Sequence, residues 1–401
     1  MSLTDRAYIV QLSIIGFLAI FSTTISKNPV LPLYASSLGA NDALIGLISA
    51  ISPLAGILLS FPVGVISDRL GRRRMLLFAG GVFLVAPLLY LFITDPFMLI
   101  PVRFFHGMAT AILGPVVSAI IAERFSSTKG ERIGQYSSAT LYGRTVAPLV
   151  GGLLISFFAI TPGLFRYQSV YLAAFIAGLI VCLLIFRIPG DKKGLDVTLT
   201  FDVFVKSLQV FWADSRLRAT AYVDMGTYFI FGAFETFFPV YLVSQGFEVY
   251  LIGIFFAVQV LSIALTKPFF GKMADKQDPR YQIMAGLMLL GLSVFLIPFC
   301  RAIILLLILT LTSGIGMSLS TVATTKYIAD IARKEEMGAS MGALSSIMDI
   351  GHSSGPFVTG VIITASGYGM GFLSGLLLAI AITVYFMMMT INRKKIQCSL
   401  I

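Results

Sequence analysis

The sequence predicts an all-α polytopic membrane protein with twelve transmembrane helices in two pseudo-symmetric six-helix bundles. Three observations predict this fold: apolar runs of about 20 residues recur from end to end, positive charge is concentrated on alternate loops, and the two halves repeat one another. Hydrophobic residues make up 57% of the 401 residues and charged residues 12%. A soluble domain carries about 25% charged residues.

Twelve apolar segments have the length needed to cross the core of a bilayer. They lie near 8–36, 42–66, 75–94, 97–122, 133–159, 168–187, 218–244, 249–271, 281–299, 302–326, 339–365 and 369–391. The first run is too long for a secretory signal peptide and has no small-residue cleavage site, so we expect it to stay as a helix.

The basic residues predict the orientation. With the N-terminus in the cytoplasm, the inner loops and tails hold most of the 29 Lys and Arg residues, whereas the outer loops hold Arg166 and Arg301. This asymmetry follows the positive-inside rule. We therefore expect both termini in the cytoplasm and a multi-pass chain in the plasma (inner) membrane. Since topology explains the net charge of +10, we expect no nucleic-acid partner.

The longest connector, residues 188–217, separates a predicted N-terminal bundle (1–187) from a predicted C-terminal bundle (218–401). Apolar residues recur along it at helical spacing, which predicts an amphipathic helix on the inner membrane surface. A helix that binds a partner is the alternative. The apolar residues are Phe201, Phe204, Val205, Leu208, Phe211 and Trp212.

The two predicted bundles repeat one another. LPLYASSLG (31–39) aligns with FPVYLVSQG (238–246), GVISDR (64–69) with GKMADK (271–276), and GRTVAPLVGG (143–152) with GHSSGPFVTG (351–360). Because six spans return the chain to the same side, both copies have the same orientation, with a site expected between them near the midplane. This arrangement suits alternating access, in which one half rocks against the other.

These motifs resemble those of the major facilitator superfamily. GVISDRLGRRR (64–74) matches that family's loop signature, G-x-x-x-D-R-x-G-R-R-R, at every position. RFFHG (103–107) resembles the span-four signature R-x-x-Q-G with His106 replacing glutamine. GQYSSATLYGRTVAPLVGG (134–152) resembles the span-five signature of proton-coupled exporters, with Ala147 replacing glycine. The resemblance extends to the drug:proton antiporter (multidrug efflux) group.

The resemblance implies a secondary active transporter, working by alternating access, that exports small amphipathic or drug-like molecules in exchange for protons. A proton symporter or uniporter that imports a sugar, organic acid or peptide is the alternative. We expect a monomer without cofactor or bound metal and with H⁺ as the coupling ion, although Na⁺ stays open. No motif of a hydrolase, P-loop enzyme or metalloenzyme is present, so we expect no enzyme.

The loop signature also predicts a cytoplasmic gate. Asp68 follows span two, where it can face the positive N-terminus of another helix, which the resemblance implies is span eleven. We expect Asp68, Arg72 and Glu123 to form a latch that holds the outward-open state, with Gly64 and Gly71 allowing a close approach. The predicted gate residues are Gly64, Asp68, Arg69, Gly71, Arg72, Arg73, Glu123 and Asp275.

Ionisable residues inside a membrane span are costly and indicate a functional site. The predicted proton-coupling and substrate-cavity residues are Lys27, Arg103, His106, Arg144, Asp224, Glu235, Asp349 and His352. The near-balance of cations and carboxylates favours a neutral, zwitterionic or amphipathic substrate.

Depth along the spans places Lys27, Arg103, His106 and Glu235 in one outer cluster, and Asp224 nearer to Asp349. We expect Asp349 or Glu235 to carry the coupling proton, because a buried carboxyl group can be neutral. His352 can titrate in the physiological range. Fixed ion pairs that hold the helices together are the alternative.

Small residues spaced by four predict close helix packing on spans five and eleven. Gly143, Ala147 and Gly151 form one stripe, and Gly351, Gly355 and Thr359 form the other. Proline in each stripe allows a bend. We expect hinged seams, with static packing as the alternative. The predicted hinge residues are Gly143, Pro148, Gly151, Gly152, Gly351, Gly355 and Pro356.

Overall fold

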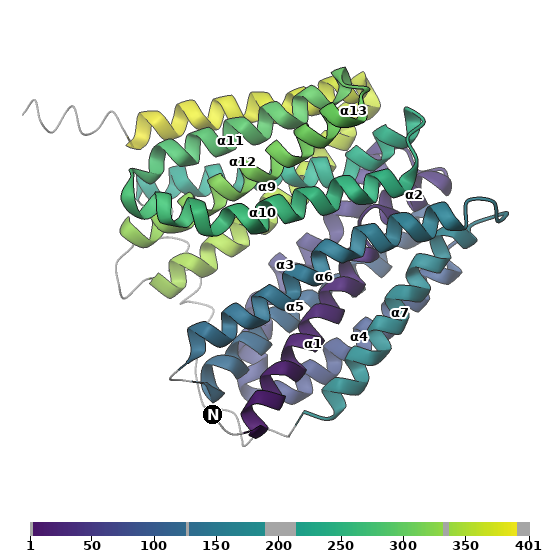
Figure 1. The fold of residues 1–401 in the computed structure, drawn as a ribbon, viewed down its shortest axis with the longest axis vertical. Coiled ribbons are helices and arrows are strands. Elements are labelled where there is room, and N and C mark those ends of the chain that lie inside the picture. Colours follow the sequence, from purple (N-terminus) through teal and green to yellow (C-terminus); the bar gives the residue numbers. More distant parts are fainter. Residues whose placement is uncertain (1–2, 126–127, 189–213, 332–336, 391–401) are drawn as a thin grey trace, which may run out of the picture. The chain divides into compact units, whose positions relative to one another are not determined.

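The computed structural model describes residues 3–125, 128–188, 214–331 and 337–390, and every regular element in these ranges is a helix (Figure 1). The longer helices before the linker are α1 (Leu3–Ile25), α2 (Val30–Ser37), α3 (Asp42–Leu70), α4 (Arg72–Leu89), α5 (Leu99–Arg124), α6 (Lys129–Phe157) and α7 (Phe165–Phe186). After the linker come α9 (Ser215–Ser244), α10 (Val249–Lys276), α11 (Pro279–Leu296), α12 (Ile303–Ile331) and α13 (Met337–Thr390). Three 3₁₀ turns are η1 (Tyr90–Phe92), η2 (Pro96–Met98) and η3 (Ile297–Phe299).

The described helices provide twelve membrane crossings. Eleven segments in the described ranges are long and apolar enough to span a bilayer, and the last of them, Leu344–Thr390, has 47 residues. A continuous helix of that length would measure about 70 Å, more than twice the core of a bilayer. Gly367, at φ 81°, breaks α13 into two helices. The twelve spans predicted from apolar length are therefore confirmed.

Local sequence signals set several helix boundaries. The side chain of Asn41 caps α3 by accepting a hydrogen bond from the backbone N–H of Leu44. Gly71 separates α3 from α4 at φ 94°, a backbone conformation that glycine adopts without steric cost. The side chain of Asp278 caps α11, which begins with Pro279.

The chain divides into two compact units. The first unit contains Met1–Thr198 and Pro239–Ala257, and the second contains Leu199–Phe238 and Val258–Ile401. The domain boundaries expected at 187 and 218 stay a prediction. The expected amphipathic helix at residues 201–212 lies outside the described residues.

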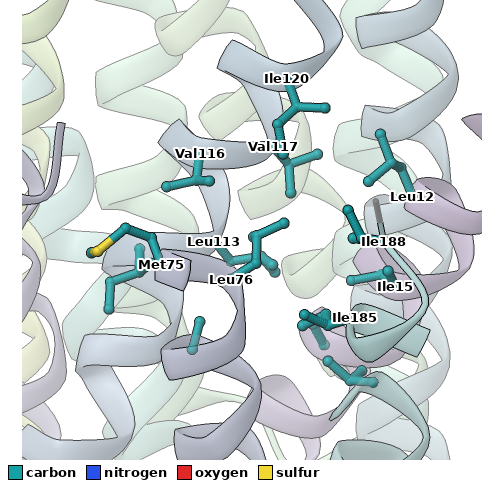
Figure 2. Close-up of a cluster of buried hydrophobic side chains, with 14 of the residues drawn as sticks. Leu12, Ile15, Met75, Leu76, Leu113, Val116, Val117, Ile120, Ile185 and Ile188 are labelled. Atoms are coloured by element: carbon teal, nitrogen blue, oxygen red, sulfur yellow. The ribbon is translucent and has the colours of Figure 1, made fainter. Parts of the chain in front are cut away.

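The core of the first unit is a cluster of mainly aliphatic side chains to which α1, α4, α5 and α7 contribute most (Figure 2). Leu12 of α1, Leu76 of α4, Leu113 and Val117 of α5 and Ile185 of α7 are each at most 1% exposed. The helices approach closely where glycine replaces a side chain. A Cβ on Gly178 of α7 would lie 2.1 Å from the carbonyl oxygen of Phe83 on α4.

The contact at Gly178 predicts that Gly178→Ala destabilises the first unit. The added methyl group would meet backbone rather than a flexible side chain, and overpacking of this kind costs about 1–3 kcal/mol. Gly81→Ala is the matched control, because a Cβ at Gly81 meets nothing within 4 Å. We expect thermal unfolding of the detergent-solubilised protein at a lower temperature for Gly178→Ala alone. Equal unfolding temperatures for the two variants would contradict the packing account.

Candidate functional site

Glu235 of α9 and His352 of α13 form an ionisable pair inside the second unit. His352 Nε2 and Glu235 Oε2 lie 2.9 Å apart, and the two side chains are 19% and 13% exposed. Gly232 makes room for this contact, because a Cβ there would lie 2.9 Å from His352 Cδ2. The pair therefore depends on a glycine one turn before the carboxylate.

Two aromatic rings lie near His352, and an acidic residue precedes it on α13. The rings of Tyr228 and Phe231 lie 6.2 Å and 6.0 Å from the ring of His352, measured between centroids. Asp349 is half-buried and precedes His352 by one turn of α13. Apolar surface combined with a few polar groups is the usual composition of a small-molecule site.

Asp224 occupies a different part of the second unit. Its side chain is 4% exposed, and Thr324 Oγ1 of α12 donates a hydrogen bond to its Oδ1 at 3.3 Å. Eleven residues of α9 separate Asp224 from Glu235, a distance of about 16 Å along the helix. Sequence patterns do not identify Thr324, because a threonine in an apolar helix carries neither charge nor a periodic signal.

Arg103 and His106 are buried inside the first unit. They are 3% and 1% exposed on α5. The hydroxyl oxygen of Tyr90 lies 3.5 Å from His106 Nδ1. The ring of Tyr90 stacks on Tyr171 of α7 with centroids 4.2 Å apart. These tyrosines were not among the predicted site residues, because a tyrosine in an apolar run is unremarkable by itself.

The other two predicted cations differ in burial. Lys27 is half-buried between α1 and α2, and Arg144 is exposed on α6. The expected outer cluster combines residues of both units, since Lys27 belongs to the first and Glu235 to the second. It stays a prediction.

The expected contact between Arg72 and Glu123 is present. Arg72 Nη2 and Glu123 Oε1 lie 2.9 Å apart, and Arg72 also donates to Ser67 Oγ. Gly71 provides the turn that brings Arg72 to the start of α4. The role of this contact as a latch stays a prediction.

The other gate residues fall into two groups. Arg73 Nη2 donates to the carbonyl oxygen of Phe186 at 3.1 Å, and Asp275 is exposed near the end of α10. Gly64, Asp68 and Arg69 lie on α3, but their side chains are outside the described part of the structure.

A second ion pair next to Glu123 was not predicted. Arg124 at the end of α5 pairs with Asp5 of α1 at 3.1 Å, and its guanidinium carbon lies 4.1 Å from the ring centroid of Tyr8. The partners are 119 positions apart in the chain, so no local pattern reveals the contact.

Both predicted glycine stripes lie at tight helix seams. A Cβ on Gly143 of α6 would lie 2.4 Å from Phe17 O of α1, and one on Gly355 of α13 would lie 2.1 Å from Phe229 O of α9. The close packing is therefore confirmed.

The remaining hinge residues extend these seams. Gly351 meets the backbone of Met225, and Gly151 meets the side chain of Ile25. Gly152 approaches the backbone of α10 within the first unit, at Val249–Tyr250 and Gly253. Pro148 and Pro356 lie inside their helices. Whether these seams bend stays a prediction.

Comparison with known proteins assigns this fold to a family. The model of the Major Facilitator Superfamily matches residues 12–264 and 250–397. The bacillibactin exporter of Bacillus subtilis is 24% identical over 383 residues, which cover 92% of each chain. Multidrug resistance protein 1 of Bacillus subtilis is 24% identical over 347 residues, covering 83% of this chain and 84% of the relative.

A crystal structure of a nucleoside transporter has the same fold. Its TM-score is 0.80 at 13% identity, and the match covers 95% of this chain and 99% of the other. The family model spans nearly the whole sequence. The chain therefore belongs to the major facilitator superfamily and is a multi-pass membrane transporter rather than an enzyme.

Proposed function

We propose that this transporter is a proton-coupled exporter of small amphipathic molecules that works by alternating access. The observation that carries the proposal is the contact between Glu235 and His352 at 2.9 Å. Intramembrane ionisable residues are costly and are typical of ion and substrate pathways. Imidazole is the side chain whose ordinary protonation change falls near neutral pH.

In this proposal, binding of the coupling proton to Glu235 changes the contact between α9 and α13. When Glu235 takes up a proton, the carboxylate loses its charge and its hydrogen bond with His352 becomes weaker. Because the two residues lie on different helices, this change favours a different contact between α9 and α13. Asp349, one turn from His352, is the second carboxyl group that can take part. Tyr228 and Phe231 offer apolar surface to an amphipathic substrate.

The names of the relatives support export. One is a bacillibactin exporter and another a multidrug resistance protein. In this proposal the coupling ion is H⁺, the chain acts as a monomer without a cofactor, and both termini lie on the cytoplasmic side of the plasma membrane.

Import of a small metabolite by symport or uniport is the second candidate function. A nucleoside transporter with the same fold favours keeping it. The direction of substrate flux in proteoliposomes under an imposed pH gradient separates the two functions. Export coupled to protons requires substrate and protons to move in opposite directions.

The proton-coupling role predicts that Glu235→Gln and Asp349→Asn impair gradient-driven transport. A substrate is first identified by ligand-induced thermal stabilisation across a library of amphipathic compounds. We then expect at least one of the two variants to lose most of its proton-driven flux, because an amide keeps the shape but exchanges no proton. Substrate binding measured by the same stabilisation should persist.

Glu248→Gln is the matched control for these variants. Glu248 is an exposed carboxylate in the turn between α9 and α10, and we expect its substitution to leave flux unchanged. Full coupling in both Glu235→Gln and Asp349→Asn would refute the carboxylate mechanism.

The proposed latch predicts that Asp68→Asn and Glu123→Gln shift the balance toward the inward-open state. The side chains of Arg72 and Glu123 are 17% and 49% exposed. An exposed ion pair contributes at most about 1 kcal/mol, which changes a two-state population about fivefold. Labelling of single cysteines on the inner side measures the shift.

Glu131→Gln is the control for the latch, because Glu131 pairs with its chain neighbour Arg132 and its side chain is 66% exposed. If labelling is unchanged in Asp68→Asn and Glu123→Gln, the latch is excluded.

A further inference from the structure

Asp224 is a buried carboxyl group that the Glu235–His352 pair does not use. It lies between α9 and α12 with 4% of its surface exposed. An ionised carboxylate removed from water needs several hydrogen-bond donors or an opposite charge. The groups around Asp224 therefore indicate which form of the carboxyl group the bundle accommodates.

The hydrogen-bond donor at Asp224 is already engaged elsewhere. Thr324 Oγ1 lies 3.3 Å from Asp224 Oδ1 and 3.0 Å from the carbonyl oxygen of Thr321. A hydroxyl group has one proton, so Thr324 can donate fully to one of these acceptors. The shorter contact is the one to Thr321. A protonated Asp224 removes the conflict, because its O–H then donates to the free lone pair of Thr324 Oγ1.

Neighbouring hydroxyl groups are engaged in the same way. Thr220 and Thr227, one turn before and after Asp224 on α9, donate to the carbonyl oxygens of Arg216 and Val223, both at 2.8 Å. Ser320 Oγ of α12 lies 2.9 Å from Thr227 Oγ1. These hydroxyl groups satisfy the helix backbone and one another instead of a negative charge.

No charged side chain in the described residues pairs with Asp224. Along α9 the nearest titratable residues are Tyr222, whose ring lies against Tyr385, and Tyr228, whose ring lies near His352. The charged residues nearest to it toward the start of α9 are Arg216, which pairs with Asp214, and Arg218, which bonds to Tyr385. On the neighbouring helices, Asp278 pairs with Arg280 at the start of α11, and Lys326 pairs with Asp330 on α12. The other titratable groups on these helices are Tyr327 of α12 and Asp349, His352 and Tyr385 of α13.

We propose that Asp224 and Thr324 form a second proton-binding site, in which the carboxyl group of Asp224 is protonated near pH 7 and donates to Thr324 Oγ1. The ligand is H⁺, and the one bond formed is the O–H bond of the carboxyl group. Asp224 is protonated in this proposal whether or not the protein transports a substrate. Its role as a second coupling proton, released and rebound once per cycle about 16 Å from Glu235, rests on the proposed function.

Infrared difference spectroscopy tests the site directly. Spectra of purified wild type and Asp224→Asn in lipid near pH 7 should differ by the carbonyl band of a protonated carboxyl group, present in wild type and absent in the variant. Asp95→Asn is the control, because Asp95 is exposed and its loss should remove no such band. A difference spectrum with the bands of an ionised carboxylate instead overturns the proposal.

Thr324→Val is a second variant that keeps the carboxyl group, so it decides the matter if Asp224→Asn does not fold. Loss of the Thr324 acceptor should shift the protonated-carboxyl band, and an unshifted band overturns the assigned hydrogen bond. The wild-type spectrum is also recorded with Na⁺ replaced by choline. A band that is present in choline and lost on adding Na⁺ would mean a sodium site and overturns the assignment to a proton site.

Proton stoichiometry tests the role in transport. Wild-type proteoliposomes should move more protons per substrate than Asp224→Asn, and an equal ratio overturns the second coupling proton. The experiments distinguish failure of the proposed function from failure of the proton site at Asp224. If Glu235→Gln and Asp349→Asn keep full coupling while the Asp224 band is present, the proposed function is wrong and the proton site at Asp224 stands.

Discussion

Helices in a bilayer gain little by burying apolar side chains against one another, because lipid tails are as apolar as leucine. Close contact between backbones has to hold them together, and here glycine permits it. Gly355 of α13 meets the carbonyl oxygen of Phe229, and Gly351 meets that of Met225. The register of α13 on α9 follows from these contacts, and it positions His352 opposite Glu235.

The seam between α9 and α13 places ionisable groups at defined depths. Gly232 faces His352, so the imidazole reaches Glu235 one turn further along α9. Asp224, eleven residues earlier, is closed off between α9 and α12 beside Thr324. One helix thus carries two carboxyl groups with different surroundings, one beside an imidazole and aromatic rings and the other among hydroxyl groups. The surroundings of each carboxyl group, rather than the residue type, determine how readily it is protonated.

The fold could be predicted from the sequence because its signals are local. Apolar runs of bilayer length predicted the twelve spans, and spacing by four predicted the glycine seams at Gly143 and Gly355. The contact of Arg72 with Glu123 followed from a loop motif and from the shared depth of two span ends.

The pairings inside the bundles could not be predicted in the same way. Glu235 and His352 are 117 positions apart, and their contact depends on helix rotation and on Gly232, which no periodic pattern reveals. The stacking of Tyr90 on Tyr171 beside Arg103 likewise depends on how α7 packs in the first unit. Uncharged partners such as Thr324 become recognisable only when the carboxyl group next to them is placed.

The central claim is that close packing at Gly232 keeps a proton-exchanging pair together. Proton-driven transport by Gly232→Ala tests it most directly, with Gly375→Ala as the control, since a Cβ at Gly375 meets its nearest neighbour, Ile230, at an ordinary 3.4 Å. The account predicts that Gly232→Ala stays folded and binds substrate but loses most proton-driven flux, whereas Gly375→Ala keeps it. Full proton-driven flux in Gly232→Ala would contradict the account.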